Sequence, residues 1–197
     1  MGTTPEPIND LNGLEIRRHR RVWQPFMDKY NCQYICEVGV FTSQNFKRMI
    51  QHNPKVAIGV DNWREDGNPG RNDSGFSQEK LDEQAEYFKK LVSAYPFVHL
   101  NRQLTADAAE NYPNEYFDLI YIDADHSYEG VKADLNAWYP KMKPGRFFTG
   151  DDYSNSHAPV VGLKFGVIKA VNEFAHHHRL EVHKLTKNGW CIIKPLK

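Results

Sequence analysis

Residues 121–130, YIDADHSYEG, place two carboxylates and an imidazole directly after a run of strand-forming residues. The acids are Asp123 and Asp125, and the imidazole belongs to His126. Two like charges this close repel each other, and water normally lets such side chains spread out. Either they sit in a solvated turn, or a positively charged species is held between them.

A second acidic group, Asp151-Asp152, lies at the end of another apolar segment. If the two segments are neighbouring strands, these acids converge with Asp123, and three carboxylates without a cation would force at least one to take up a proton. A divalent cation removes this conflict, and an all-oxygen ligand set suits Mg²⁺, Mn²⁺ or Ca²⁺, of which we expect Mg²⁺. Zinc is disfavoured because no Cys/His spacing supports it. The alternative is that Asp151-Asp152 only caps the next turn and that Asp125 is solvated.

His126 follows Asp123 by three positions and would lie beside this cation. A histidine there can remove a proton from a substrate hydroxyl at neutral pH. We therefore predict His126 and Asp123 as catalytic residues, and Asp123, Asp151 and Asp152 as metal ligands. For His126 the alternative is a structural histidine that hydrogen-bonds to the turn backbone.

Two further acids end apolar segments nearer the N-terminus. Glu37 precedes Gly39, which lets another group approach the backbone closely, and Asp61 ends the next apolar segment. A carboxylate in that place suits a ribose diol. The turn lacks the further glycines of G-x-G-x-x-G, which argues against NAD or FAD and for a nucleoside cofactor without a phosphate. The alternative for Gly39 is a tight strand-to-helix turn and nothing more.

The elements that position these residues alternate along the chain. Apolar, β-branched and aromatic runs predict strands over 33–41, 55–63, 97–102, 116–123, 145–153, 180–185 and 189–194. Amphipathic segments predict helices over 10–30, 42–53, 76–96, 104–113, 128–142 and 167–178, the first broken near Pro25. Thr42 or Ser43 is the expected N-cap of the second helix.

This alternation predicts an α/β fold: a Rossmann-like, doubly wound, mostly parallel seven-stranded sheet with a C-terminal antiparallel hairpin. Ligands then gather at the carboxyl ends of the first and fourth strands, where the strand order reverses. Residues 1–30 are expected to be an N-terminal helical extension, and residues 31–197 a single domain. Loops over 62–76 and 153–166 would cover the site, with apolar walls from Trp63, Phe76, Tyr153 and Phe165.

Composition narrows the class of partner. The 197 residues carry 25 basic and 25 acidic side chains, so no electrostatic footprint for nucleic acid or a membrane surface is present. No apolar run is long enough for a transmembrane helix, and the N-terminus has no signal-peptide core, which predicts a cytoplasmic protein. A small-molecule partner is expected, and a homo-oligomer stays open.

The segments CEVGV, VDNW and IDADHSYEGVKADL…GDDY resemble the class I S-adenosylmethionine (SAM)-dependent methyltransferases over residues 34–195. The resemblance is closest to small-molecule O-methyltransferases of secondary and sugar metabolism. In the metal-dependent branch, acids end the fourth and fifth strands, and the spacing here matches, 151 − 123 = 28. That branch has a catalytic lysine where His126 stands.

The resemblance implies that residues 31–197 are a SAM-dependent methyltransferase domain. It implies methyl transfer to a hydroxyl of a sugar, polyketide or phenolic compound, assisted by a divalent cation. The cofactor site it implies comprises Glu37, Gly39, Thr42, Ser43, Asp61, Asn62, Gln103, Leu104, Thr105 and Asp123. Two alternatives keep this fold: a metal-independent enzyme with His126 as base, and a SAM-binding subunit without catalysis.

Overall fold

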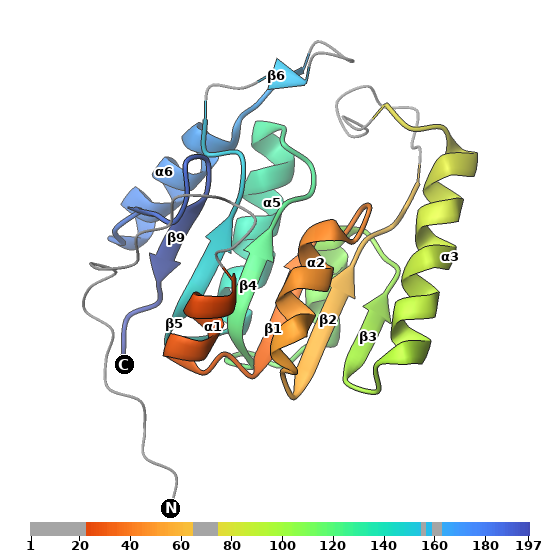
Figure 1. Cartoon of the computed structure of the whole chain (residues 1–197). Coiled ribbons are helices and arrows are strands. Elements are labelled where there is room, and N and C mark those ends of the chain that lie inside the picture. The colour runs from red at the N-terminus through yellow and green to blue at the C-terminus, as the bar shows by residue number, and fades with distance from the viewer. Residues whose placement is uncertain (1–22, 65–74, 155–156, 159–162) are drawn as a thin grey trace, which may run out of the picture.

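The computed structural model describes residues 23–64, 75–154, 157–158 and 163–197. Within them, seven strands form one sheet in the order β3-β2-β1-β4-β5-β9-β8 (Figure 1). β1 to β5 run parallel, whereas β9 is antiparallel to β5 and β8 is antiparallel to β9. The bounds are β1 Tyr34–Val38, β2 Val56–Val60, β3 Val98–Asn101, β4 Phe117–Ile122, β5 Met142–Gly150, β8 His183–Lys184 and β9 Trp190–Ile193. The predicted doubly wound sheet with its C-terminal hairpin is confirmed.

The order of the strands reverses between β1 and β4. β1 pairs with β2 on one side and with β4 on the other, so that Val38 lies opposite both Val60 and Ile122. In sheets of this kind the crevice for a ligand lies beyond the carboxyl ends of the strands at such a reversal. The chain segments that follow β1, β2, β4 and β5 therefore meet at one edge of the sheet.

Helices cover both faces of the sheet (Figure 1). One face packs against α1 Trp23–Tyr30, α2 Gln44–Met49 and α3 Gln78–Ala94. The other packs against α4 Thr105–Ala108, α5 Tyr128–Trp138 and α6 Val167–His178. Short 3-10 turns follow α2, α4 and α5 at Ile50–His52, Ala109–Asn111 and Tyr139–Lys141. All residues of β4 are buried, as expected for a strand between two helical layers.

Two local features differ from the expectation. For the predicted helix over 10–30, the structure describes only the part from Trp23 through Pro25 to Tyr30, because residues 10–22 lie outside the described residues; the break near Pro25 stays a prediction. Two short strands, β6 His157–Ala158 and β7 Leu163–Lys164, pair within the predicted loop 153–166. Ser43 occupies the N-cap of α2, but its backbone is left-handed (φ 62°) and its side chain makes no capping hydrogen bond.

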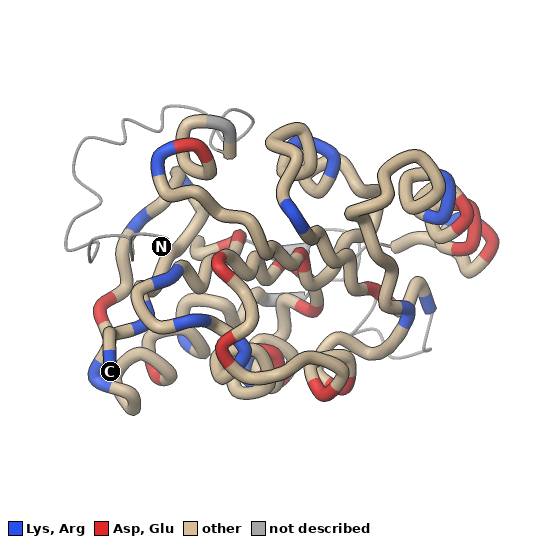
Figure 2. Tube along the Cα trace, turned by 90° about the horizontal axis from the view of Figure 1, so that it is seen from below, with Lys and Arg blue, Asp and Glu red and all other residues tan. Residues whose placement is uncertain are grey.

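The cysteines, the apolar content of the helices and the distribution of charge agree with what the amino-acid composition indicates. The three cysteines are free and buried. Among the described helices, none is long and apolar enough to cross a membrane. Figure 2 shows positions of both charge signs spread over the described trace.

Candidate functional site

A cavity of about 900 Å³ opens at the carboxyl ends of β1, β2 and β4. Small-molecule sites commonly have volumes of about 300–1,000 Å³. Many of the predicted site residues line it: Glu37, Gly39, Thr42, Asp61, Asn62, Leu104, Thr105, Asp123, His126 and Asp151. Residues from five separate segments of the sequence thus share one cavity.

Glu37 is a buried carboxylate in the wall of this cavity. Its side chain is 1% exposed, and Oε1 accepts a hydrogen bond of 3.2 Å from Asn45 Nδ2. Burial raises the pKa of Glu37 well above its usual range; the charge of Asp123 adds to this, and the hydrogen bond from Asn45 opposes it. A cationic ligand group would favour the ionised form of this carboxylate.

Gly39 follows β1 with φ 91°, a backbone conformation that side chains rarely adopt. A Cβ atom at this position would lie 2.2 Å from the carbonyl oxygen of Asp123 and 2.6 Å from Cα of Ala124. The close approach expected at Gly39 is therefore an approach of the end of β4. It brings the residues after β1 and β4 against each other at the cavity.

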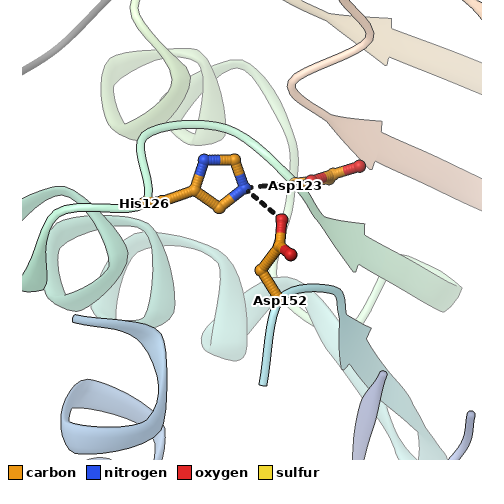
Figure 3. A group of neighbouring side chains, drawn as sticks. All are labelled: Asp123, His126 and Asp152. Atoms are coloured by element: carbon orange, nitrogen blue, oxygen red, sulfur yellow. Dashed lines mark hydrogen bonds and ion pairs between the residues drawn. The ribbon is translucent and has the colours of Figure 1, made fainter. Parts of the chain in front are cut away.

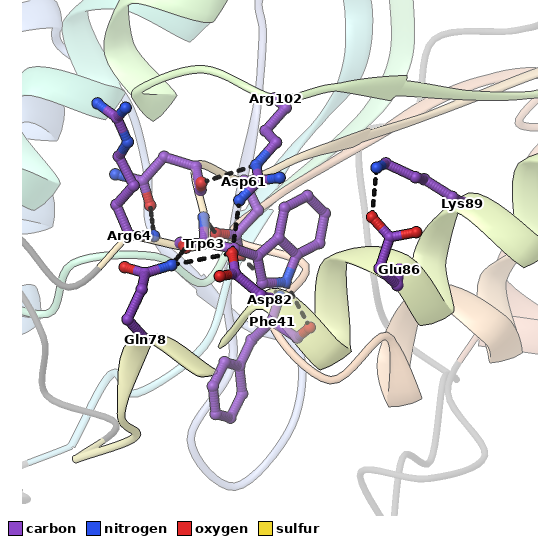
Figure 4. A network of polar contacts seen from close by, with 10 residues as sticks. Phe41, Asp61, Trp63, Arg64, Gln78, Asp82, Glu86, Lys89 and Arg102 are labelled. Atoms are coloured by element: carbon purple, nitrogen blue, oxygen red, sulfur yellow. Dashed lines mark hydrogen bonds and ion pairs between the residues drawn. The ribbon is translucent and has the colours of Figure 1, made fainter. Parts of the chain in front are cut away.

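Asp61 organises the two turns that flank it (Figure 4). Its Oδ2 accepts the backbone N–H of Phe41 and its Oδ1 accepts that of Trp63, both at 2.8 Å. The Trp63 indole donates in turn to the carbonyl of Phe41 at 3.0 Å. Burial raises the pKa of Asp61, and these backbone donors partly oppose the shift. Each oxygen keeps a second lone pair for a ligand hydroxyl.

The other predicted cofactor residues divide into two groups. Thr42, Asn62, Leu104 and Thr105 line the cavity. Ser43 is fully buried behind it, and Gln103 is exposed and accepts from Asn111 Nδ2 instead. The structure therefore does not bring Ser43 or Gln103 into the cavity lining.

The predicted aromatic walls also divide. Trp63 lines the cavity and packs against Phe88 of α3, with ring centroids 5.6 Å apart. Phe76 packs on Phe41, at a centroid distance of 4.9 Å. Tyr153 donates its hydroxyl to Asn172 at 2.6 Å, outside the cavity lining.

Asp123, His126 and Asp152 form one cluster at the ends of β4 and β5 (Figure 3). Nε2 of His126 lies 2.9 Å from Oδ2 of Asp152 and 3.3 Å from Oδ1 of Asp123. The three side chains are half-buried. Asp151, predicted as a ligand beside them, lies outside this cluster but lines the cavity. The positive group between the carboxylates can be the imidazolium of His126 itself.

Neighbouring segments hold the His126 ring in place. The ring of Phe165 stacks on it with centroids 4.5 Å apart and planes at 16°. The backbone N–H of Gly166 donates to the His126 carbonyl at 2.8 Å. Ser127 caps α5 by accepting from Gly130, and its own N–H donates to Asp125 at 2.8 Å. Asp125 therefore orders the turn before α5; it is half-buried and lines the cavity, which differs from the solvated side chain of the alternative.

The cluster also fits a divalent cation. Its three ligand atoms, two oxygens and one nitrogen, lie within 4.8 Å of one another. Two atoms bonded to one ion at about 2.0–2.2 Å lie roughly 2.8–4.4 Å apart, and the distances of 2.9 and 3.3 Å from His126 Nε2 fall in this range. The nitrogen departs from the predicted all-oxygen set, because His126 takes the place expected for Asp151.

Four residues that the sequence reasoning missed contribute to the site. Tyr121 and Asp134 line the cavity and are buried, and Asn45 lines it and contacts Glu37. Burial, with the charges of nearby carboxylates, raises the pKa of the Tyr121 phenol well above its usual range. Trp23 contacts Asn45 from α1. Tyr121 and Asp134 carry a recognisable signal, a polar group on a buried strand or helix face, whereas Asn45 and Trp23 carry none.

Comparisons with known proteins agree with this geometry. Residues 36–153 match a family described as a methyltransferase domain, and this stretch includes every predicted site residue. The uncharacterized protein y4gI of Sinorhizobium fredii (strain NBRC 101917 / NGR234) is 28% identical over 88 residues. Those residues are 43% of this chain and 9% of that protein, so the match spans a small part of the relative's length.

Solved structures share the fold. The calicheamicin methyltransferase CalS11 superposes with a TM-score of 0.64 at 16% identity, covering 90% of this chain and 80% of that one. The methyltransferase PaMTH1 of Podospora anserina, solved with SAH bound, gives a TM-score of 0.58 at 13% identity, covering 87% and 75%. At such identities the likeness is one of fold.

Proposed function

The chain belongs to the methyltransferase-domain family, and from this premise we propose that it transfers a methyl group from SAM to a hydroxyl oxygen of a small molecule. The observation that carries the proposal is the position of the Asp123–His126–Asp152 cluster. Its first two members line the same cavity as Glu37 and Asp61. A group that can handle a proton and the acids suited to a nucleoside cofactor thus share one cavity.

SAM supplies a methyl group on a sulfonium centre that is already a strong electrophile, so the protein has to align and desolvate the reactants. Glu37 is the acceptor for the positively charged amino-acid end of the cofactor. Asp61 accepts the ribose hydroxyls with the lone pairs that its backbone donors leave. Leu104 and Thr105 border the adenine.

His126 removes the proton from the acceptor hydroxyl. Because Nε2 faces two carboxylates, the neutral ring carries its proton on Nε2 and its lone pair on Nδ1. When Nδ1 takes the hydroxyl proton, Asp123 and Asp152 stabilise the resulting imidazolium. The stacked ring of Phe165 fixes the plane of the imidazole.

A divalent cation is part of the proposal. Asp123, His126 and Asp152 would hold it, and a bound cation lowers the pKa of a hydroxyl placed on it. The imidazole nitrogen suits softer ions than an all-oxygen set does, so Mn²⁺ is to be compared with Mg²⁺. When His126 binds the cation as a ligand, it does not also act as the base.

The acceptor class follows from the neighbours and the charge. CalS11 is named a TDP-rhamnose 3′-O-methyltransferase, which supports a sugar hydroxyl among the proposed acceptors, beside polyketide and phenolic hydroxyls. The neutral charge balance supports a small molecule rather than nucleic acid or a membrane surface. We further propose a cytoplasmic location and a single catalytic domain over residues 31–197, and leave a homo-oligomer to be measured.

The test is transfer of a labelled methyl group from SAM to a panel of hydroxylated sugars, polyketides and phenols, with added Mg²⁺ or Mn²⁺ and with EDTA. We expect a labelled ether in at least one class. Isothermal titration with SAM is run in parallel. SAM binding without transfer to any acceptor would favour a non-catalytic subunit, and absence of SAM binding would overturn the proposal.

One observation favours a metal-independent enzyme as the second candidate. Nε2 of His126 already lies within hydrogen-bonding distance of Asp152 and close to Asp123, so the neutral ring can donate to these acids without an ion and keep Nδ1 for the hydroxyl proton. Transfer at an unchanged rate in EDTA would select this form.

A further inference from the structure

Helix α1 is linked to Glu37, the acid proposed to bind the cofactor, by two successive hydrogen bonds through the side chains of Trp23 and Asn45. We propose that Trp23 and Asn45 are positioning residues that orient the Glu37 carboxylate for a cationic amino-acid group, so that α1 belongs to the cofactor site. This inference rests on the proposed function. Neither residue was predicted from the sequence, and Trp23 does not line the cavity, so it acts through Asn45.

The contacts form a chain from α1 to the end of β1. The Trp23 indole N–H donates to Asn45 Oδ1 at 2.6 Å, and Asn45 Nδ2 donates to Glu37 Oε1 at 3.2 Å. An indole nitrogen can only donate, so it requires the oxygen of the Asn45 amide to face it. The NH₂ group is thereby turned toward Glu37. The hydrogen bond from Trp23 thus ensures that the Asn45 side chain presents its NH₂ donor, and not its oxygen, to Glu37.

Packing fixes Trp23 at the start of this chain. Its ring meets that of Tyr121 edge-on, with centroids 5.0 Å apart and planes at 90°, and Tyr121 itself lines the cavity. Phe26, one turn further along α1, packs on Phe147 of β5 at 4.7 Å. Trp23 is 3% exposed. The indole therefore has little freedom to turn away from Asn45.

The series of hydrogen bonds from Trp23 through Asn45 leaves one oxygen of Glu37 available to a ligand. Oε1 is taken by Asn45, whereas Oε2 is buried without a hydrogen-bond partner among the described residues. A buried carboxylate oxygen without a donor is unfavourable, and a bound ammonium group would supply the missing donor. Because one oxygen is already held, the carboxylate cannot rotate freely, and the other stays directed at the ligand.

The experiment compares the binding of two nucleosides that differ in whether they carry the amino-acid group proposed to contact Glu37. SAH carries the amino-acid group, and 5′-methylthioadenosine lacks it. We expect Trp23→Phe and Asn45→Leu each to raise the Kd of SAH by about 3- to 10-fold, the effect of one hydrogen bond, and to leave the Kd of 5′-methylthioadenosine within about 2-fold. Isothermal titration on the full chain measures both.

The effects of the two substitutions on the Kd of SAH should also be less than additive, because both interrupt the same series of hydrogen bonds. Tyr30→Leu is the matched control in α1: it removes a buried aromatic ring that packs on Phe26 and Phe147 rather than on Trp23 or Asn45, so it should lower Tm and leave the SAH Kd unchanged. Equal weakening of both nucleosides by Trp23→Phe, or full retention of SAH affinity, would overturn the inference. If the unaltered protein binds neither nucleoside, the proposed function itself fails.

Discussion

His126 Nε2 lies 2.9 Å from Asp152 Oδ2, although the two residues follow different strands, β4 and β5. The pairing of those strands brings the histidine to the acid. Asp123 Oδ1 lies 3.3 Å from the same nitrogen. Two carboxylates and one imidazole therefore converge at one place, with their ligand atoms within 4.8 Å of one another, and the proposed function assigns the handling of the hydroxyl proton to this cluster.

Replacing His126 should separate chemistry from cofactor binding. If His126 is the base of the metal-independent form, His126→Ala should lower kcat by about 10²- to 10⁴-fold and leave the Kd of SAH nearly unchanged. Steady-state kinetics and titration measure the two quantities. His177→Ala, an exposed histidine at the end of α6, is the control and should retain full activity. An active His126→Ala enzyme would remove this residue from the mechanism.

The two adjacent acids after β5 should differ in metal affinity. Because Asp152 belongs to the cluster and Asp151 does not, Asp152→Asn should weaken Mn²⁺ binding more than Asp151→Asn does. Electron paramagnetic resonance of free Mn²⁺ measures this without any turnover. EDTA should abolish transfer, and Mg²⁺ or Mn²⁺ should restore it. A larger loss for Asp151→Asn would contradict the assignment.

Asp61 should contribute to both stability and affinity. In Asp61→Asn, an NH₂ group must face one of two backbone N–H donors, so we expect a loss of about 1–3 kcal/mol in the free energy of unfolding and a weaker Kd for SAH. Urea denaturation and titration measure these. Asp82→Asn is the control, since its contacts with Gln78 and Arg102 are exposed (Figure 4) and should contribute less than about 1 kcal/mol.

Gly39 should tolerate no side chain. Gly39→Ala combines φ 91° with a contact of 2.2 Å to the Asp123 carbonyl, so we expect a loss of at least about 2 kcal/mol in stability and a displaced cluster. Gly145→Ala is the matched control: φ is 70°, and the added carbon meets only the Leu196 side chain, at 2.9 Å. Its loss should be about 1 kcal/mol. Equal losses would show that backbone strain alone acts at Gly39.

Stability should fall as the pH rises through neutrality because of Asp134. Burial raises the pKa of Asp134 to about 7 from 3.8; the Thr105 side chain opposes the shift and the charge of Asp125 adds to it. The folded state then binds the proton more tightly than the unfolded state. The stability this contributes is complete below about pH 4 and is lost as the pH rises through about 7.

A neutral amide at this position should remove that loss. Asp134→Asn should therefore be more stable than the unaltered protein at pH 8.5 by up to about 4 kcal/mol, and at pH 4.5 by only about 1 kcal/mol. Thermal melts at the two pH values check this. A difference that is the same at both values would exclude titration of Asp134 as the cause.

The local sequence pattern was enough to predict the strands and helices and the edge of the sheet at which the acids lie. The unbroken apolar run before Asp123 predicts a strand covered on both faces, and the acids that follow such runs fall at the carboxyl edge of a parallel sheet. Ser77 caps α3 as an N-cap before an amphipathic run should. These inferences need only periodicity and the preferences of residues near one another in sequence.

Finer placement depended on backbone angles at the strand ends. Asp152 has φ 52°, which turns it to His126, whereas its neighbour Asp151 lines the cavity. No residue preference distinguishes two adjacent aspartates. Ser43 likewise has a left-handed backbone, with φ 62°, and is fully buried outside the cavity lining.

By itself, the sequence determined the sheet, the alternation of its helices, and the strand ends at which Glu37, Asp61, Asp123 and Asp151-Asp152 stand, because hydrophobic period and turn residues are local signals. Only the tertiary structure decided that His126 lies between Asp123 and Asp152, and that Trp23 reaches Glu37 through Asn45. Those contacts join segments far apart in the chain. Their partners are chosen by how strands pair and helices pack, which no short stretch of residues encodes.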